Sequence, residues 1–285
     1  MLKQRVITAI ILLAVLLGTL LAPGPWPLIL FLIVTAGCAV WEWLRLTWPS
    51  QNTVYPVVVA LVMAAVMIVL SVQWLSATPA SWSLDVQREL NAGLLPVVAL
   101  LWVFGASLLV YRGQVGVRSG GLALSAFGVV AVLAVWLALV QLFLTYGGWF
   151  LVSLLALIWF ADIAAYFTGK AFGRHKLAPK ISPGKTWEGA IGGVAAATIW
   201  VFLSQYWEGS FGAVLATRWS MAAVLVIAVL LAALSIVGDL FESLLKRRAG
   251  VKDSSQLLPG HGGVYDRIDA LLPVAPIALL LTQGG

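Results

Sequence analysis

Long apolar runs alternate with short polar connections along the whole chain, and this pattern predicts a helical membrane protein. A helix needs about 20 apolar residues to cross a hydrocarbon core of about 30 Å. Stretches such as Pro23-Gly24-Pro25 and Gly147-Gly148 mark tight connections between runs. The predicted spans are Val6–Ala22, Leu28–Trp43, Val54–Val72, Leu94–Val110, Leu122–Leu144, Trp149–Phe172, Ala190–Tyr206, Met221–Leu245 and Ile268–Leu281.

The first and last runs each leave an alternative open. The first run follows Lys3 and Arg5, so a cleaved signal peptide is the alternative to a retained helix. It lacks a clear small-x-small cleavage site, and we expect the helix to be retained. The last run is short and contains Pro273 and Pro276, so we expect a kink or only partial insertion.

Composition supports this class and excludes others. Of the 285 residues, 62% are apolar and 10% charged, whereas an average soluble domain is roughly 45–50% apolar and about 25% charged. Such a chain lacks the polar surface of a soluble globule, is too apolar for disorder, and has too little charge for a nucleic-acid binder. The single cysteine, Cys38, excludes a disulfide framework and, with two histidines, a Cys/His zinc site. We interpret Cys38 as an apolar residue inside a span.

Basic residues indicate the orientation. With a cytoplasmic N-terminus, 15 of the 17 Lys and Arg residues fall on the inner side, and only Arg88 and Arg218 fall outside. The positive-inside rule requires this kind of bias. We therefore expect an all-α protein with about nine transmembrane helices, a cytoplasmic N-terminus and an external C-terminus. The inner set is Lys3, Arg5, Arg45, Arg112, Arg118, Lys170, Arg174, Lys176, Lys180, Lys185, Lys246, Arg247, Arg248, Lys252 and Arg267.

Polar chemistry is concentrated in the second half of the chain. Residues 1–150 carry three acids and no histidine, whereas residues 160–270 carry the other eight acids and both histidines. We therefore expect residues 1–147 to form a lipid-facing scaffold of transmembrane helices. Residues 148–285 are expected to form the catalytic region, with cytosolic loops at 170–189 and 246–267.

Acidic residues near the inner ends of predicted helices are candidate metal ligands. Asp162 lies inside or near the inner end of a span, where a carboxylate is costly and is a functional candidate; the alternative is neutralisation by a neighbouring cation. Asp239, Glu242 and Lys246 share one helical face, and carboxylates three residues apart can converge on a hard cation. The alternative there is a local Glu242–Lys246 ion pair.

The stretch from Lys246 to Asp269 interleaves bases, acids and glycines, which suits phosphate and metal chemistry. Asp266 and Asp269 stand three apart and can hold Mg²⁺ together with a substrate phosphate. A lipid-headgroup anchor is the alternative for a basic run at a membrane surface, but an anchor does not need acids, glycines and a histidine.

A second basic loop precedes the seventh span. Its Gly184-Lys185-Thr186 is similar to the end of a P-loop, but Pro179 stands where the first glycine is required, so the stretch is no Walker motif. The loop is still suited to phosphate contact. We interpret His175 in the same loop as a polar surface residue.

These residues together resemble a known family. Ser243-Leu-Leu-Lys246-Arg247, then Lys252-Asp253, then the run from Leu258-Pro259 through His261-Gly262-Gly263 to Asp266-Arg267-Ile268-Asp269 resembles the signature of phosphatidate cytidylyltransferases, also called CDP-diacylglycerol synthases. The loop 182–189 resembles the family's second basic motif. Two departures, Ile163-Ala164 in place of Ser-Gly and Ala270 in place of Ser, remove no charged group.

The resemblance implies the reaction CTP + phosphatidate → CDP-diacylglycerol + pyrophosphate, dependent on Mg²⁺, in phospholipid biosynthesis. It implies an integral protein of the bacterial cytoplasmic (inner) membrane with its active site on the cytosolic side. CTP is a soluble anion that would meet a basic inner surface, whereas phosphatidate stays in the bilayer, so the site must open to lipid. Membrane enzymes of this kind can form homodimers, and the sequence leaves the oligomeric state open.

The resemblance also implies roles for particular residues. The expected metal ligands are Asp239 and Asp266, with Asp162, Glu242 and Asp269 as further ligands or neighbours, and five carboxylates leave room for a second cation. The expected catalytic residues are Lys246, Arg247, Lys252, His261 and Arg267, which neutralise or orient phosphates. The expected substrate-binding residues are Ser182, Lys185, Thr186, Gly262 and Gly263.

Rival functions make different predictions. A secondary transporter would place acids at mid-span in two inverted halves, but here the acids lie toward inner ends and only in the second half. A related CTP-dependent enzyme, an archaeal-lipid cytidylyltransferase or a polyprenol kinase, would differ in its lipid and is separable by lipid competition. A structural protein has no need of this density of acids on the cytosolic face.

Overall fold

A computed structural model describes residues 2–48, 54–117 and 121–283. Within these ranges six helices are long and apolar enough to cross a membrane, which confirms the helical membrane class. They are α2 (Trp26–Thr47), α3 (Val54–Trp74), the continuous segment Ser81–Arg112, α7 (Leu122–Phe172), α8 (Trp187–Ser204) and α10 (Met221–Ala249). The predicted inner residue Arg118 lies outside the described residues, as do the side chains of Lys3 and Arg5.

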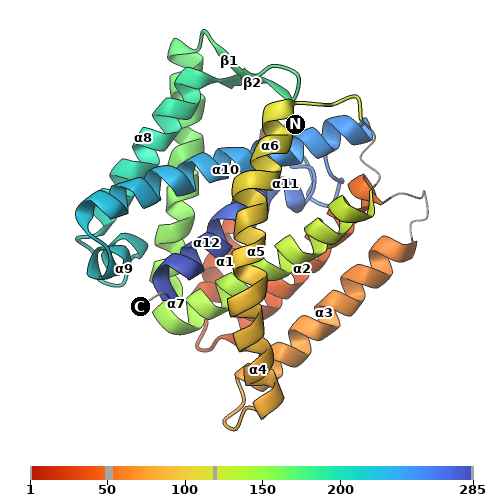
Figure 1. Ribbon diagram of the computed structural model, residues 1–285, viewed down its shortest axis with the longest axis vertical. Helices are drawn as coiled ribbons and strands as arrows, with labels where there is room; N and C mark the ends of the chain where they lie inside the picture. The colour runs from red at the N-terminus through yellow and green to blue at the C-terminus, as the bar shows by residue number, and fades with distance from the viewer. Residues whose placement is uncertain (1, 49–53, 118–120, 284–285) are drawn as a thin grey trace.

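Shorter elements complete the fold (Figure 1). The segment Ser81–Arg112 consists of α4 (Ser81–Glu89), α5 (Leu95–Leu100) and α6 (Ser107–Arg112), joined by π-helical turns at Leu90–Leu94 and Leu101–Ala106. The other helices are α1 (Leu2–Leu20), α9 (Phe211–Arg218), α11 (Tyr265–Ile268) and α12 (Leu271–Gln283). The strands are β1 (Lys176–Ala178) and β2 (Ser182–Thr186).

The break in α7 and the start of the helical segment Ser81–Arg112 both bear on the predicted spans. The 51-residue α7 is broken at Gly147, whose φ of 83° and ψ of −177° are non-helical, so the predicted connection at Gly147-Gly148 is confirmed. The helix that contains the predicted fourth span, Leu94–Val110, begins earlier in the sequence, at Ser81. The charged residues Asp85 and Arg88 lie exposed on this helix and pair at 3.0 Å.

The helix α10 crosses the middle of the molecule and contacts α2, α6, α8 and α12 (Figure 1). Its residue Phe241 packs in an aromatic cluster with Trp43 of α2 and Trp102, at ring-centroid distances of 5.6 and 5.3 Å. Trp43 also packs against Tyr265 of α11 at 5.0 Å. This buried cluster therefore fixes the C-terminal end of α10 against α2 and α11.

The two strands form an antiparallel hairpin that the sequence did not predict. Its residues Pro179, Pro183 and Gly184 give no alternating apolar pattern, so nothing in the local sequence indicates a strand. The hairpin is held instead by Ile181, which is buried against Leu240 and Leu244 of α10. This contact places the loop 176–186 over the last turns of α10.

The second half of α7 packs closely along α8 through glycines. A Cβ atom at Gly193 would lie 2.6 Å from the carbonyl oxygen of Ala161, and one at Gly189 would lie 2.8 Å from that of Ala165. Small residues allow this approach of two membrane helices. The packing sets Asp162 on α7 beside the beginning of α8 and the hairpin that precedes it.

Candidate active site

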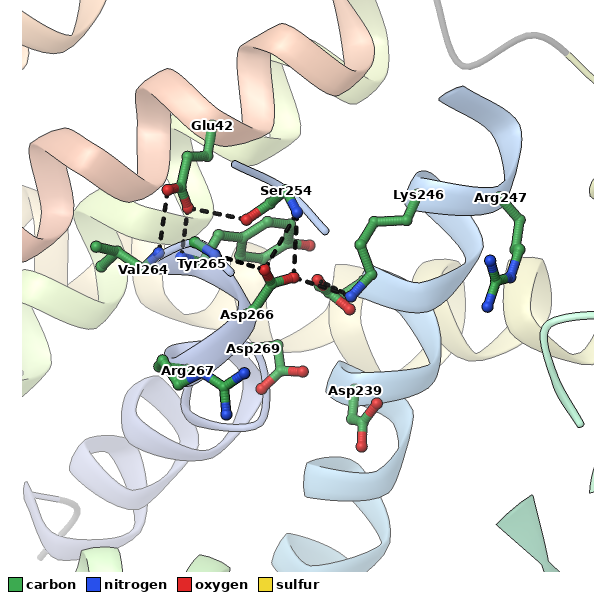
Figure 2. Close-up of polar contacts among 12 residues, drawn as sticks. Glu42, Asp239, Lys246, Arg247, Ser254, Val264, Tyr265, Asp266, Arg267 and Asp269 are labelled. Atoms are coloured by element: carbon green, nitrogen blue, oxygen red, sulfur yellow. Dashed lines mark hydrogen bonds and ion pairs between the residues drawn. The ribbon is translucent and has the colours of Figure 1, made fainter. Parts of the chain in front are cut away.

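Three carboxylates converge where α10 meets the segment after α11. Asp239 and Glu242 lie on one face of α10, and Asp269 follows α11; Figure 2 shows Asp239 and Asp269 on these facing elements. Each of the three offers a ligand atom within 4.8 Å of those of the other two. Gly238 allows the approach, because a Cβ atom there would collide with the backbone of Asp269 and Ala270.

Two lysines border this acid cluster. Lys185, brought from the hairpin, forms an ion pair with Asp239. Lys246 lies one turn beyond Glu242 on α10 and contacts the Glu242 carboxylate at 2.6 Å and that of Asp266 at 2.8 Å. The predicted cluster of Asp239, Glu242 and Lys246 is thus joined by Asp266 from α11 and by Lys185 from the second basic loop.

Asp266 belongs to the network but not to the three converging carboxylates. Its oxygens accept the backbone N–H groups of Gly263 at 2.7 Å and Ser254 at 3.1 Å, as well as the Lys246 amine. Burial alone would raise the pKa of the Asp266 carboxyl, but its contacts with Glu242, Lys246 and Gly263 hold that pKa well below the usual range. Asp266 therefore carries a negative charge that fixes Lys246 and the loop before α11.

Asp162 stands next to the acid cluster. Its exposed side chain interacts electrostatically with Asp239 and Lys185. Asp269 in turn interacts with Asp239, Lys185 and Asp162. Asp162 of α7 thus lies within electrostatic range of Asp239 on α10 and of Asp269 after α11.

Two of the predicted phosphate-binding residues make other contacts, and a third is half-buried. Thr186 is buried and caps α8 by accepting the N–H of Gly189 at 3.2 Å. Arg247 donates to the carbonyl oxygen of Ile181 at 3.2 Å, and Figure 2 shows it on the other side of α10 from Asp239. Ser182 lies half-buried at the start of β2.

The remaining predicted residues lie on the loop 250–264 and at the start of α11. The exposed Arg267 donates to the carbonyl oxygen of His261 at 2.6 Å. Nδ1 of His261 is buried and has no hydrogen-bond partner among the described residues. Lys252 is exposed, and Gly262 adopts a φ of 83°, which favours glycine.

Comparison with known proteins identifies the family. The chain matches the model of the Cytidylyltransferase family over residues 3–283, almost its whole length. The chain belongs to the cytidylyltransferase family.

Relatives of the chain include three bacterial phosphatidate cytidylyltransferases. The chain is 39% identical over 296 aligned residues to the phosphatidate cytidylyltransferase of Pseudomonas aeruginosa, covering 100% of this chain and 98% of the relative. It is 37% identical over 288 residues to that of Haemophilus influenzae, covering 97% and 96%. A shorter match of 134 residues, 50% identical, relates it to that of Brucella suis and covers 47% of this chain and 46% of the relative.

The carboxylates of the acid cluster fit the divalent cation that a cytidylyltransferase would use with a nucleoside triphosphate. Carboxylate oxygens are the ligands that Mg²⁺ prefers, and Asp239, Glu242 and Asp269 supply three of them from two elements. The hydroxyl of the fully buried Tyr265 has no hydrogen-bond partner among the described residues and lies in the electrostatic field of Glu242 and Asp269. These groups together offer oxygen atoms suited to a hard cation.

One residue that the sequence reasoning missed is Glu42 of α2. It was counted with the scaffold because only three acids lie in the first 150 residues. Its side chain is fully buried and accepts hydrogen bonds from the loop 250–264 and from α11. The signal was available, since an acid at the end of an apolar span is a functional candidate by default.

Proposed function

We propose that the chain is a phosphatidate cytidylyltransferase, which converts CTP and phosphatidate to CDP-diacylglycerol and pyrophosphate in phospholipid biosynthesis. The observation that carries this proposal is the convergence of Asp239, Glu242 and Asp269 beside Lys185 and Lys246. Carboxylates suit a hard cation and amines suit phosphate oxygens. The names of the full-length relatives support the same reaction.

An apolar groove supports a lipid as the second substrate. The groove lies between α8 and α10, has a volume of about 670 Å³ and is lined almost only by apolar side chains, including Trp187, Val194, Ala233 and Leu240. Its lining follows α10 from residue 229 to residue 240, about 16 Å at 1.5 Å per residue. Leu240 follows Asp239 in sequence, so one end of the groove lies at the acid cluster. A phosphatidate with an acyl chain in this groove would present its phosphate to Lys185.

The proposed chemistry is substitution at the α-phosphorus of CTP. A phosphate oxygen of phosphatidate forms a bond to this phosphorus, the bond to the oxygen that bridges to the β-phosphate breaks, and pyrophosphate leaves. A phosphate monoester has a second pKa of about 6, so the nucleophile is largely dianionic at neutral pH and needs no strong general base. The barrier is mainly repulsion between anions, which positioning and positive charge reduce.

The chain's own residues supply that positioning. Lys185 and Lys246 would hold phosphate oxygens at the acid cluster, and the exposed side chains of Lys252 and Arg267 would add positive charge from the loop side. We assign Asp239, Glu242 and Asp269 as the ligands of Mg²⁺, which when bound neutralises phosphate charge. Asp162 is a candidate ligand for a second cation, whereas the contacts of Asp266 favour a role in holding Lys246.

The membrane topology belongs to the same proposal. If the two halves of α7 each cross the bilayer and α1 and α12 are also inserted, the described helices give nine spans. The predicted inner segments support one common side, because Arg247 contacts Ile181 of the hairpin and Arg248 donates to Gln114 after α6 at 2.9 Å. We place this side on the cytosolic face of a bacterial inner membrane. Residues 148–285 form the catalytic region, and residues 1–147 support it.

Lipid transfer experiments with two labelled forms of CTP test the proposed reaction. Purified protein is incubated with CTP labelled in the α-phosphate or in the γ-phosphate and with phosphatidate, diacylglycerol or a polyprenol. We expect the α-label to enter the lipid extract with phosphatidate only. Entry of the γ-label with the polyprenol or diacylglycerol would instead indicate a lipid kinase, and no transfer to any lipid would contradict the proposal.

A further inference from the structure

The carboxylate of Glu42 lies at the centre of a set of contacts that joins α2 to the loop 250–264. Its Oε1 atom accepts the Ser255 hydroxyl at 2.5 Å and the Val264 N–H at 3.0 Å. Its Oε2 atom accepts the Ser254 hydroxyl at 3.0 Å and the Tyr265 N–H at 2.6 Å (Figure 2). One carboxylate thus binds both ends of the segment 254–265.

Because Glu42 is buried, the loss of any of these hydrogen bonds would cost free energy. The Glu42 side chain is 0% exposed, so its oxygens have no water to replace a lost donor. Among the described residues the charge of Glu42 is met by these four hydrogen bonds and not by an ion pair within 4.0 Å. A buried charge held only in this way requires its donors to stay in place.

The segment that Glu42 holds is the one that sets the acid cluster. The N–H groups of Ser254 and Gly263 bind the Asp266 carboxylate, and Asp266 binds Lys246. Asp269 follows Asp266 by three residues and lies directly after the short helix α11. Movement of residues 254–265 would therefore displace both Lys246 and a predicted metal ligand.

We propose that Glu42 is a positioning residue of the active site, which clamps the loop 250–264 and α11 so that Asp266, Lys246 and Asp269 keep their geometry. The role in catalysis rests on the proposed function, whereas the clamping of the loop does not. Glu42 does not touch the three converging carboxylates itself. It acts through the backbone N–H groups and serine hydroxyls that it accepts.

Gly263, which lies in the loop that Glu42 contacts, supports the same assignment. A Cβ atom at Gly263 would lie 2.6 Å from both carboxylate oxygens of Glu42 and would collide with the Ser254 hydroxyl. The loop backbone therefore needs glycine at this position to reach Glu42. Gly263→Ala is expected to reproduce the effect of losing the Glu42 carboxylate.

Glu42→Gln is a sharp test because of how the donors are divided. Each oxygen of Glu42 accepts one hydroxyl and one backbone N–H. Whichever way a glutamine amide is turned, its NH₂ group meets a backbone N–H that cannot act as an acceptor. Glu42→Asp keeps both acceptor oxygens and only shortens the side chain, so it is the conservative variant.

The experiment measures hydrogen–deuterium exchange in the loop together with steady-state kinetics of pyrophosphate release. For Glu42→Gln we expect faster exchange in residues 250–266 and a kcat lowered by about 10- to 100-fold, the usual size for groups that hold a metal ligand. The KM for CTP is expected to change by less than about threefold, because the clamp orients groups and does not bind the nucleotide. Glu42→Asp is expected to recover part of both effects.

Two control variants separate positioning from general damage. Glu89→Gln makes the same chemical change at an exposed acid of α4 and is expected to alter neither readout. Ser153→Ala removes a buried hydroxyl that accepts the Phe211 N–H at 2.7 Å in α7, and it is expected to lower thermal stability without changing exchange in residues 250–266.

Other outcomes would overturn the inference. Unchanged loop exchange in Glu42→Gln would show that Glu42 does not clamp the loop, and a loss of kcat equal to that of Ser153→Ala would show a merely structural role. If wild-type protein released no pyrophosphate, the proposed function would fail, and the exchange measurement alone would still decide whether Glu42 holds the loop.

Discussion

At the scale of single residues, four acids of the site have different surroundings and therefore different expected roles. Asp239, Glu242 and Asp269 converge, whereas Asp266 is occupied by Lys246 and two backbone N–H groups. Two carboxylates only three residues apart in sequence thus have different surroundings. The sequence alone could not distinguish them, because the difference arises from the folding of the loop 250–264 around Asp266.

These different surroundings predict that substitution of Asp269 changes the Mg²⁺ requirement more than substitution of Asp266. We expect Asp269→Asn to lower kcat by roughly 100-fold or more, as for loss of an electrostatic group in a dry site, and to raise the Mg²⁺ concentration needed for half-maximal activity. Asp85→Asn, the same change at an exposed acid of α4, is the control and is expected to be silent. The measurement is pyrophosphate release over a Mg²⁺ titration.

An unchanged Mg²⁺ requirement in Asp269→Asn would remove Asp269 from the ligand set. A larger shift in Asp266→Asn than in Asp269→Asn would return the ligand role to Asp266, as the sequence first indicated.

At the scale of elements, the site is assembled by two contacts between segments distant in sequence. Ile181 packs the hairpin onto α10 and brings Lys185 to Asp239. The carboxylate of Glu42 holds the loop 250–264 from α2. Both are tertiary contacts, so the sequence could give the participating residue types but not these pairings.

The helices themselves were largely predictable, for identifiable reasons. Apolar runs gave most of their positions, and two adjacent glycines gave the break in α7 at Gly147. The hairpin was not predictable, because its short strands are stabilised by packing on α10 and not by an alternating pattern. The early start of α4 was missed because charges such as Asp85 and Glu89 lie on the exposed side of a helix that continues through them.

The groove between α8 and α10 leads to a prediction about acyl chains. Ala233→Phe would place a ring in the groove, so we expect a higher KM for long-chain phosphatidate and little change for a short-chain phosphatidate. The measurement compares the two lipids at saturating CTP. Ala222→Phe, on an exposed position of α10 outside the groove lining, is the matched control.

Equal effects of Ala233→Phe on both lipids, or equal effects of the two phenylalanine variants, would exclude the groove as the site of the acyl chain.

At the scale of the whole molecule, three segments that the charge bias predicts to be on the inner side contact one another. Contacts between the C-terminal end of α10, the hairpin and the segment after α6 bring three predicted inner segments together. This arrangement suits an enzyme that takes a soluble nucleotide from the cytosol and a lipid from the inner leaflet. Orientation in the membrane is nevertheless a prediction of charge bias and not of the fold.

Cysteine labelling tests the orientation, and the chain is well suited to it because Cys38 is its single cysteine. In a Cys38→Ser background, Arg174→Cys is expected to react with a membrane-impermeant maleimide only after bacterial cells are opened. Arg218→Cys is expected to react in intact cells. Both positions are exposed, so the reverse pattern would show the opposite orientation.

We propose that the acid cluster catalyses transfer of the cytidylyl group from CTP to phosphatidate. The most direct test is CTP-dependent pyrophosphate release by protein in phosphatidate-containing proteoliposomes, with and without Mg²⁺, for wild type and Asp239→Asn. We predict release that needs phosphatidate and Mg²⁺ and that falls by roughly 100-fold or more in the variant. Release that persists without phosphatidate, or that is as fast in Asp239→Asn as in wild type, would show that the acid cluster does not catalyse this transfer.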